Sequence, residues 1–381
     1  MRWDAMRIQT GDAAPTAPAG SRSQAGATAP ALFERSAVTR SFDTPGFRGM
    51  TFFEVHARSI INRVPEASRV PFRWTINPYR GCSHGCVYCF ARNTHTYLDL
   101  DAGHDFDSKI VVKVNAPDLV RKELGARKWQ GEHIAMGTNV DCYQRAEGRY
   151  QLMPGILQAL LDARNPFSIL TKGTMILRDL DLLVQAAEVT DVGLSVSVGC
   201  ADEELWRTLE PGTPSPQRRL GVCAALTGRG LPCGVLMGPV VPFLSDSPAQ
   251  LDATVRQVAE SGASQVSPIV LHLRPGAREW FLAWLAEHHT SLVPRYRELY
   301  GTGAYAPKAY QRQIGEQVRS LAERYGVGRG GPGRRAWRAQ RAVPSGWNRP
   351  VRNAAAPNGG AANGPGGDGP GDAGPVQLSL L

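Results

Sequence analysis

Apolar residues follow two patterns that alternate along the chain. Short runs rich in Val, Ile and Leu predict buried strands, whereas longer stretches with an apolar residue at every third or fourth position predict helices. The expected strands are residues 72–77, 133–137, 167–170, 192–198, 234–237 and 265–271, and the expected helices are residues 152–163, 177–189, 216–227 and 249–260. Strands that alternate with helices in this way are typical of repeated βα units around a parallel sheet.

The number of these units predicts the architecture. Six units are too few to close an eightfold barrel, which takes about 250 residues. We therefore expect an α/β fold, a partial (βα)6 barrel with an open mouth. Because functional groups of parallel βα folds lie at the carboxyl ends of strands, the polar residues after each expected strand are candidates for a site. Among them are Lys172, Ser195 with Ser197, and His272 with Arg274.

The two ends of the chain have a different composition. Residues 1–50 are rich in Ala, Pro, Gly, Ser and Thr and contain few large apolar residues, which predicts a disordered leader. Residues 326–381 are dominated by Gly and Pro without any apolar period, which predicts a disordered tail. The folded domain is therefore expected to span residues 51–325.

The net charge of the chain bears on the kind of partner it binds. The chain of 381 residues has 43 Lys and Arg against 34 Asp and Glu, a formal net charge of +9. Within residues 326–381 there are seven Arg and two Asp, so this tail carries 7 − 2 = +5. A basic tail favours a polyanionic partner such as nucleic acid, although a solubilising segment is the plainer alternative. Without an apolar membrane span or signal core, the chain is expected to be a soluble, cytoplasmic monomer.

Three closely spaced cysteines carry the strongest chemical signal. Cys82, Cys86 and Cys89 have the spacing C-x3-C-x2-C, whereas Cys142, Cys200, Cys223 and Cys233 are scattered. A 4Fe-4S cluster takes four cysteine thiolates, so three would leave one iron open to a substrate or cofactor. A zinc site is a weaker interpretation because no second pair of ligands follows, and reduced core cysteines are the remaining alternative.

Several motifs resemble a known family. The spacing of the three cysteines within residues 77–90 and the aromatic residues between and after them resemble the radical S-adenosylmethionine (radical SAM) superfamily. Residues 137–144, 168–172, 176–183, 210–220 and 239–242 resemble its DNA repair photolyase-like group, the relatives of spore photoproduct lyase. The resemblance implies that the open iron binds S-adenosylmethionine. It also implies that an electron from a flavodoxin- or ferredoxin-type donor releases a 5'-deoxyadenosyl radical.

The resemblance also implies roles for individual residues. Cofactor-binding residues carried over from the family are Tyr88, whose backbone would face the adenine, Thr138, Asp141, Lys172, Ser195, Ser197 and Arg218. Ser195 and Ser197 have the alternative of hydrogen bonds across the sheet, and Arg218 that of a solvated helix face. Lys172 ends an apolar strand, where a buried ammonium needs a partner such as a ligand carboxylate or phosphate.

The sequence departs from spore photoproduct lyase in the expected hydrogen donor. That enzyme has a hydrogen-donating cysteine at the end of the second strand, where this chain reads Met136-Gly137-Thr138. Cys142 lies close by and is a candidate for a displaced catalytic donor, with a buried structural cysteine as the alternative. The missing thiol at residue 137 argues against repair of the spore photoproduct itself.

The last residues of the chain form an apolar cluster after a long Gly and Pro spacer. Gln377, Leu378, Leu380 and Leu381 resemble the short peptide by which bacterial DNA polymerases and repair enzymes bind the sliding clamp. A tethered peptide of this kind would raise the effective concentration of the domain at DNA. The alternative is a hydrophobic end without a function.

Together these features predict a radical SAM enzyme that acts on nucleic acid, in DNA repair or base modification. Two alternatives remain open at this point. One is a radical SAM enzyme that modifies RNA, protein or a small metabolite. The other is a non-catalytic iron-sulfur protein that binds DNA or the clamp.

Overall fold

The computed structural model describes residues 37–66, 68 and 70–327. The peptide 377–381, the arginine-rich tail from residue 328 and the leader up to residue 36 lie outside the described residues. Within the described part of the chain, no helix is long and apolar enough to cross a membrane.

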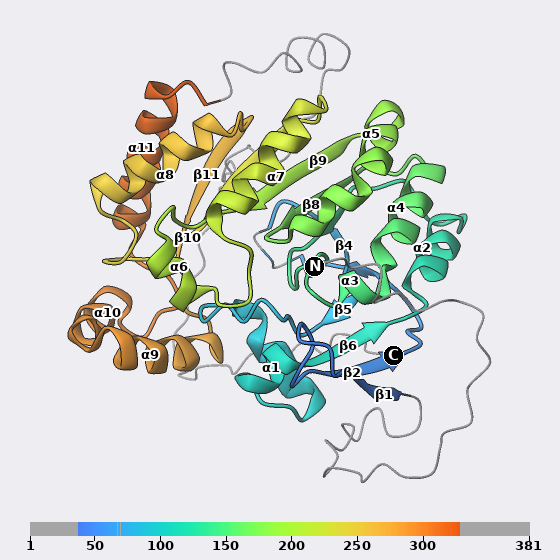
Figure 1. Ribbon diagram of the computed structural model, residues 1–381, viewed down its shortest axis with the longest axis horizontal. Helices are drawn as coiled ribbons and strands as arrows, with labels where there is room; N and C mark the ends of the chain where they lie inside the picture. Colours follow the sequence, from blue (N-terminus) through green and yellow to red (C-terminus); the bar gives the residue numbers. More distant parts are fainter. Residues whose placement is uncertain (1–36, 67, 69, 328–381) are drawn as a thin grey trace, which may run out of the picture.

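A seven-stranded sheet forms the centre of the molecule (Figure 1), with the strand order β11-β10-β9-β8-β7-β4-β3. Its six parallel strands are β4 (Trp74–Ile76), β7 (Ile134–Met136), β8 (Phe167–Thr171), β9 (Val192–Ser197), β10 (Cys233–Val240) and β11 (Gln265–Val270). Each falls on one of the six predicted segments. The seventh strand, β3 (Ile61–Arg63), pairs antiparallel with β4. Because β3 and β11 are opposite edges, the sheet is open among the described residues, as the partial-barrel prediction requires.

Helices cover the outer face of this sheet. The predicted helices correspond to α4 (Leu152–Asp162), α5 (Leu180–Val189), α7 (Pro216–Gly228) and α8 (Pro248–Glu260), and α2 (Ala116–Leu124) precedes β7. The expected helix 177–189 is divided, because a 3-10 turn, η3 (Thr174–Asp179), comes before α5. Helices α7 and α8 begin with a serine cap followed by proline at the first position, which satisfies free N–H groups without disturbing the helix.

The core lies between the sheet and these helices. Strand residues Ile134, Phe167 and Val196 are fully buried against helix residues such as Leu160 and Leu226. The central strands β7 and β8 are buried along nearly their whole length, and their sequences are accordingly largely apolar. This is why the local pattern was sufficient to predict them.

A second, four-stranded sheet was not predicted. It has the order β1 (Val38–Ser41), β2 (Thr51–Val55), β6 (Lys109–Lys113) and β5 (Tyr79–Arg80). Strand β1 and the fully buried Phe47 lie inside the stretch predicted as a disordered leader. The predicted boundary at residue 50 is therefore corrected, since residues 38–50 belong to the folded part of the chain.

Further helices complete the described part of the chain. They are η2 (Phe90–Leu98), α1 (His104–Ser108), α3 (Glu147–Tyr150), α6 (Glu203–Leu209), α9 (Ala277–His288), η4 (Thr290–Leu292), α10 (Val293–Tyr300) and α11 (Lys308–Arg324). Helix α11 packs beside α8 and against β11 (Figure 1). Helices α9 and α10 form a separate core, in which Tyr296 donates a hydrogen bond to the carbonyl of Pro242 at 2.6 Å.

Candidate active site

A pocket of about 180 Å³ opens at the carboxyl ends of the parallel strands. Its walls come from residues at or just after the carboxyl ends of β7, β8, β9 and β11, from β10, and from the loop that carries the three cysteines. The lining residues include Cys82, His84, Cys86, Tyr88, Cys89, Phe90, Gly137, Thr138, Asn139, Asp141, Lys172, Ser197, Ile269 and His272. The fold thus brings most of the candidate residues to the place where parallel βα folds carry their sites.

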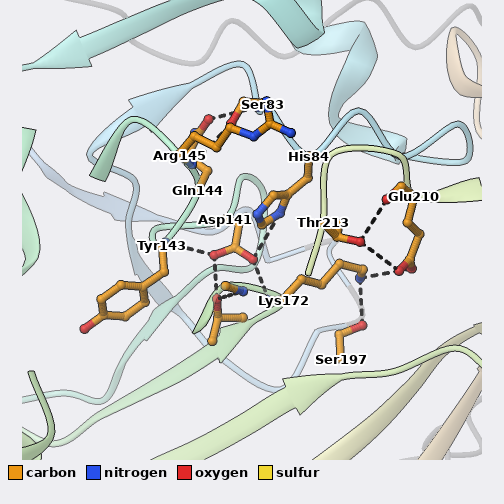
Figure 2. Close-up of polar contacts among 12 residues, drawn as sticks. Ser83, His84, Asp141, Tyr143, Gln144, Arg145, Lys172, Ser197, Glu210 and Thr213 are labelled. Carbon is orange, nitrogen blue, oxygen red and sulfur yellow. Dashed lines mark hydrogen bonds and ion pairs between the residues drawn. The ribbon is translucent and has the colours of Figure 1, made fainter. Parts of the chain in front are cut away.

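The cysteine loop is held on one side by the segment after β7. Gln144, fully buried, accepts a hydrogen bond from the Ser83 N–H and donates one to the Gly81 carbonyl, both at 2.9 Å. The Arg145 N–H donates to the Ser83 hydroxyl at 3.2 Å (Figure 2). One side-chain amide therefore satisfies two backbone groups and fixes the start of the loop.

On its other side the loop contacts the segment after α6. The Val87 N–H donates to the Leu209 carbonyl at 3.0 Å, and the Gly212 N–H donates to the His84 carbonyl at 2.9 Å. A Cβ at Gly212 would lie 2.2 Å from the Ser83 carbonyl oxygen, so only glycine fits this approach.

A buried arginine holds the middle of the cysteine loop. Arg92, with no exposed surface, donates from Nε and Nη2 to the Cys86 carbonyl, and its Nη2 also contacts both carboxylate oxygens of Asp107 at 2.9–3.0 Å. Its charge is therefore paired as well as buried, which keeps the arginine in a single geometry.

The chemistry of the three thiols suits iron ligation. Burial raises the pKa of Cys82, Cys86 and Cys89, so attached iron must displace their protons. Among the described residues, no three His, Cys, Asp or Glu side chains converge on a point that would hold one metal ion. A cluster that takes one cysteine per iron does not need such convergence, whereas a zinc ion with ligands at about 2.3 Å does.

Asp141 joins three parts of the site (Figure 2). Its Oδ1 accepts hydrogen bonds from the Tyr143 N–H at 2.8 Å and the Thr171 hydroxyl at 2.7 Å. Its Oδ2 accepts from the Lys172 N–H at 2.6 Å and lies 3.5 Å from His84 Nδ1. Since both oxygens are occupied by protein groups, Asp141 positions the cysteine loop relative to the end of β8.

Lys172 contacts two polar side chains from other segments, Ser197 and Glu210. Its Nζ donates to the Ser197 hydroxyl at 2.7 Å and lies 4.0 Å from Glu210 Oε1 (Figure 2). The same carboxylate accepts a hydrogen bond from the Tyr88 hydroxyl. The partner that the sequence predicted for a buried lysine is thus supplied by the protein itself.

Glu210 is paired with a second buried cation. Arg219 Nη2 donates to Glu210 Oε2 at 2.5 Å, and its Nη1 donates to the Ser197 carbonyl at 2.7 Å. Burial alone raises the pKa of Glu210, but Arg219 and then Lys172 outweigh it and hold that pKa below its ordinary value. The carboxylate is therefore ionised at neutral pH.

Two predicted cofactor-binding residues lie elsewhere. Arg218 is exposed, and its backbone N–H caps α7 through the Ser215 hydroxyl. It is the neighbouring Arg219, 1% exposed, that points into the site. Ser195 is absent from the lining residues because it lies two residues before Ser197 on β9, further from the carboxyl end.

Comparison with known proteins agrees with this geometry. Residues 76–253 match the family model described as the radical SAM superfamily. The uncharacterized protein Rv2578c of Mycobacterium tuberculosis is 49% identical over 292 residues, which cover 77% of this chain and 86% of that protein. The chain belongs to the radical SAM superfamily.

Two more distant similarities were also found. The uncharacterized protein MJ0683 of Methanocaldococcus jannaschii is 30% identical over 195 residues, which cover 51% of this chain and 69% of the relative. Spore photoproduct lyase complexed with dinucleoside spore photoproduct has a TM-score of 0.55 at 15% identity, with 73% of this chain and 80% of that chain covered. This similarity shows a shared fold.

Membership of the radical SAM superfamily implies a 4Fe-4S cluster and S-adenosylmethionine as cofactors. The residues present fit this implication, because three thiols and several polar strand-end groups line one pocket. Thr138 and Asn139 line it from the segment after β7, and Tyr88 lines it from the cysteine loop.

The structure bears on the predicted hydrogen donor through Cys142 and Gly137. Cys142 is fully buried in the hydrophobic core and is absent from the pocket lining, so its placement favours the structural alternative. Gly137 has φ +74°, and a Cβ there would lie 1.8 Å from the Leu170 carbonyl oxygen. This backbone therefore excludes a cysteine at residue 137.

Sequence reasoning missed Gln144, Glu210 and Arg219 as site residues. All three lie within the segments 137–144 and 210–220 that carried the family resemblance. The resemblance of these two segments was the signal that could have identified the three residues. In the structure, their side chains are buried beside the cysteine loop.

Proposed function

We propose that the protein is a radical SAM enzyme that binds a 4Fe-4S cluster through Cys82, Cys86 and Cys89 and acts on nucleic acid. The observation that carries this proposal is the common pocket of the three thiols and the strand-end polar residues. When bound, the cluster and S-adenosylmethionine would supply a 5'-deoxyadenosyl radical, which abstracts a hydrogen atom from the substrate.

The chain's own residues would bind and orient the cofactor. Tyr88, Thr138, Lys172 and Ser197 line the pocket and are the proposed contacts to S-adenosylmethionine. Lys172 brings a positive charge toward ligand carboxylate, and Glu210 with Ser197 holds that ammonium in place. Asp141 and Gln144 hold the cysteine loop in a fixed position relative to β7 and β8.

Charge and structural likeness support nucleic acid as the substrate class. The net charge of +9 favours a polyanion, and a solved structure of the similarly folded spore photoproduct lyase contains a dinucleoside photoproduct. A flavodoxin- or ferredoxin-type electron donor and a sliding clamp bound through Gln377, Leu378, Leu380 and Leu381 remain proposed partners.

The test is anaerobic reconstitution of the cluster followed by measurement of iron content and 5'-deoxyadenosine in the presence of dithionite. Cys82→Ala, Cys86→Ala and Cys89→Ala should each abolish 5'-deoxyadenosine formation, because each removes one of only three ligands. Cys223→Ala is the matched control, since Cys223 is also buried but lies on α7 outside the pocket lining. Full iron content in the triple alanine variant would contradict the cluster assignment.

The substrate class is tested by the yield of 5'-deoxyadenosine with added irradiated DNA, undamaged DNA, RNA or peptide. An increase with nucleic acid alone is expected. An increase with peptide alone would favour a protein-modifying enzyme, and no cofactor cleavage under any condition would favour a non-catalytic iron-sulfur protein.

A further inference from the structure

The open side of the pocket carries an unusual group of exposed rings. Phe90 directly follows the third cysteine and is 36% exposed, and Tyr305, in the loop before α11, is 54% exposed. His272 lies between them, two residues after the end of β11, with its ring centre 5.5 Å from that of Phe90 and 5.7 Å from that of Tyr305. Three rings from distant parts of the chain therefore form one continuous surface.

Exposed apolar residues are concentrated here. Six large hydrophobic side chains are exposed among the described residues, and three of them, Phe90, Ile269 and Tyr305, surround His272 or line the same pocket. Aromatic surface left in water at a pocket mouth, rather than scattered over the molecule, indicates a binding function.

Arg274 connects the two outer rings. Its guanidinium carbon lies 5.6 Å from the centre of the Phe90 ring, and its Nη2 donates to the Tyr305 hydroxyl at 3.1 Å. The arginine thus restrains both side chains and adds a positive charge beside them. Aromatic faces combined with a cation are the elements by which proteins bind unpaired bases and the adjoining phosphates.

His272 adds an unsatisfied polar atom. Its Nδ1 is buried and has no hydrogen-bond partner. Burial and then the charge of Arg274 lower the pKa of His272, so the ring is neutral at physiological pH and offers one donor and one acceptor. Because buried polar atoms are nearly always paired, a ligand is the natural partner for this nitrogen.

We propose that Phe90, His272 and Tyr305, connected by Arg274, form a stacking platform that receives one unpaired nucleobase at the entrance of the pocket. This inference rests on the proposed function for the class of substrate, and goes beyond it by naming the form in which the nucleic acid enters. A base within a duplex has no free face to stack on these rings, so the substrate enters as a single strand or as a flipped-out nucleotide.

The experiment measures binding of a labelled single-stranded oligonucleotide, and of the same strand in a duplex, to the full-length reconstituted protein by fluorescence anisotropy. Phe90→Leu and Tyr305→Leu remove a ring but retain an apolar side chain, and each should weaken single-strand binding about 5- to 150-fold. Tyr305→Phe keeps the ring and should bind within about threefold of the wild type.

Tyr97→Leu is the matched control. Tyr97 lies on the same helical segment as Phe90 and is 48% exposed, but it is not among the pocket residues. Its replacement should leave binding unchanged. Iron content should be equal in all four variants, which verifies that the cysteine loop is intact.

Two results would overturn the platform, and they have different meanings. If Phe90→Leu and Tyr305→Leu bind the single strand as tightly as the wild type, the platform is wrong while the proposed function stands. If the wild type binds neither oligonucleotide, nucleic acid is wrong as the substrate class and the platform fails with it.

Discussion

At the scale of single residues, the site is organised by a buried carboxylate between two cations. Glu210 contacts Arg219 and Lys172, and it accepts a further hydrogen bond from Tyr88. Removal of one partner from a buried pair leaves an uncompensated charge, which costs more than the pair itself contributes. Arg219 therefore supports the geometry of Lys172 and Ser197 without lying at the mouth of the pocket.

Arg219→Met should lower the free energy of unfolding by about 3–5 kcal/mol, because the charge of Glu210 loses its main partner. Chemical denaturation measures this change. Arg218→Met is the control, since Arg218 is exposed one position earlier, and it should change stability by less than about 0.5 kcal/mol. Adding Glu210→Gln to Arg219→Met should recover part of the loss. Equal stability of the two single variants would contradict this assignment.

At the scale of elements, the close approach of β7 and β8 determines the shape of the pocket wall. Met136 pairs with Ile169, and the next residue, Gly137, contacts the Leu170 carbonyl directly. The strand ends at this point with a positive φ that glycine adopts without strain. Thr138 and Asp141 then enter the pocket lining.

Gly137→Ala should be more destabilising than Gly131→Ala, although their φ values are nearly equal at +74° and +72°. In both variants the left-handed backbone conformation costs alanine about 1–2 kcal/mol. Only residue 137 has a neighbour, since nothing lies within 4 Å of a Cβ at Gly131. Overpacking at residue 137 should add about 1–3 kcal/mol. Denaturation of both variants measures the difference, and equal losses would show that β7 and β8 separate freely.

Strand β6 of the small sheet contains a lysine in an unfavourable position. Burial, and then the charge of Arg80, lower the pKa of Lys113 from 10.5 to about 8, although Glu123 opposes the shift. Among the described residues, Lys113 forms no ion pair. The buried charge of Lys113 therefore lowers the stability of the folded state, and the attraction of Glu123 offsets only part of this loss.

Lys113→Met should raise the free energy of unfolding by about 1–3 kcal/mol near pH 7. Below pH 8 the lysine is charged in both states and its full cost is present. Between about pH 8 and pH 10.5 the folded chain releases the proton first, so wild-type stability increases with pH relative to the variant. Denaturation near pH 7 and near pH 10 tests this, and a constant difference would contradict the shifted pKa.

At the scale of the whole molecule, the folded domain and the ends of the chain are expected to act separately. The peptide 377–381 and the arginines of the tail lie outside the described residues, so the clamp hypothesis depends on the sequence alone. A short leucine peptide is expected to bind the clamp with a dissociation constant of about 1 μM.

Deletion of residues 377–381 should abolish clamp binding while iron content and cofactor cleavage stay unchanged, because the long spacer separates the peptide from the domain. Replacement of Arg334, Arg335, Arg338 and Arg341 by Gln should instead reduce the salt dependence of DNA binding. Titration of the tail peptide into purified clamp measures the first effect. Absence of binding at hundreds of micromolar would remove the clamp from the proposed partners.

The sequence alone determined the parallel strands and the cysteine motif, because both are local. A strand buried on two faces is recognisable from its own apolar residues, and the spacing of Cys82, Cys86 and Cys89 lies within eight residues. All six parallel strands were therefore predicted close to their observed positions.

Only the tertiary structure decided which polar groups meet. Successive residues of a helix point about 100° apart, so the choice of Arg219 over Arg218 depends on the orientation of α7 against Glu210. Tyr88 and Glu210 meet although 122 residues separate them. In the small sheet, β2 and β6 pair although Thr51 and its partner Lys109 lie in distant parts of the sequence. The burial of Cys142 and the assembly of Phe90, His272 and Tyr305 likewise arise from contacts between distant segments, which a local pattern does not contain.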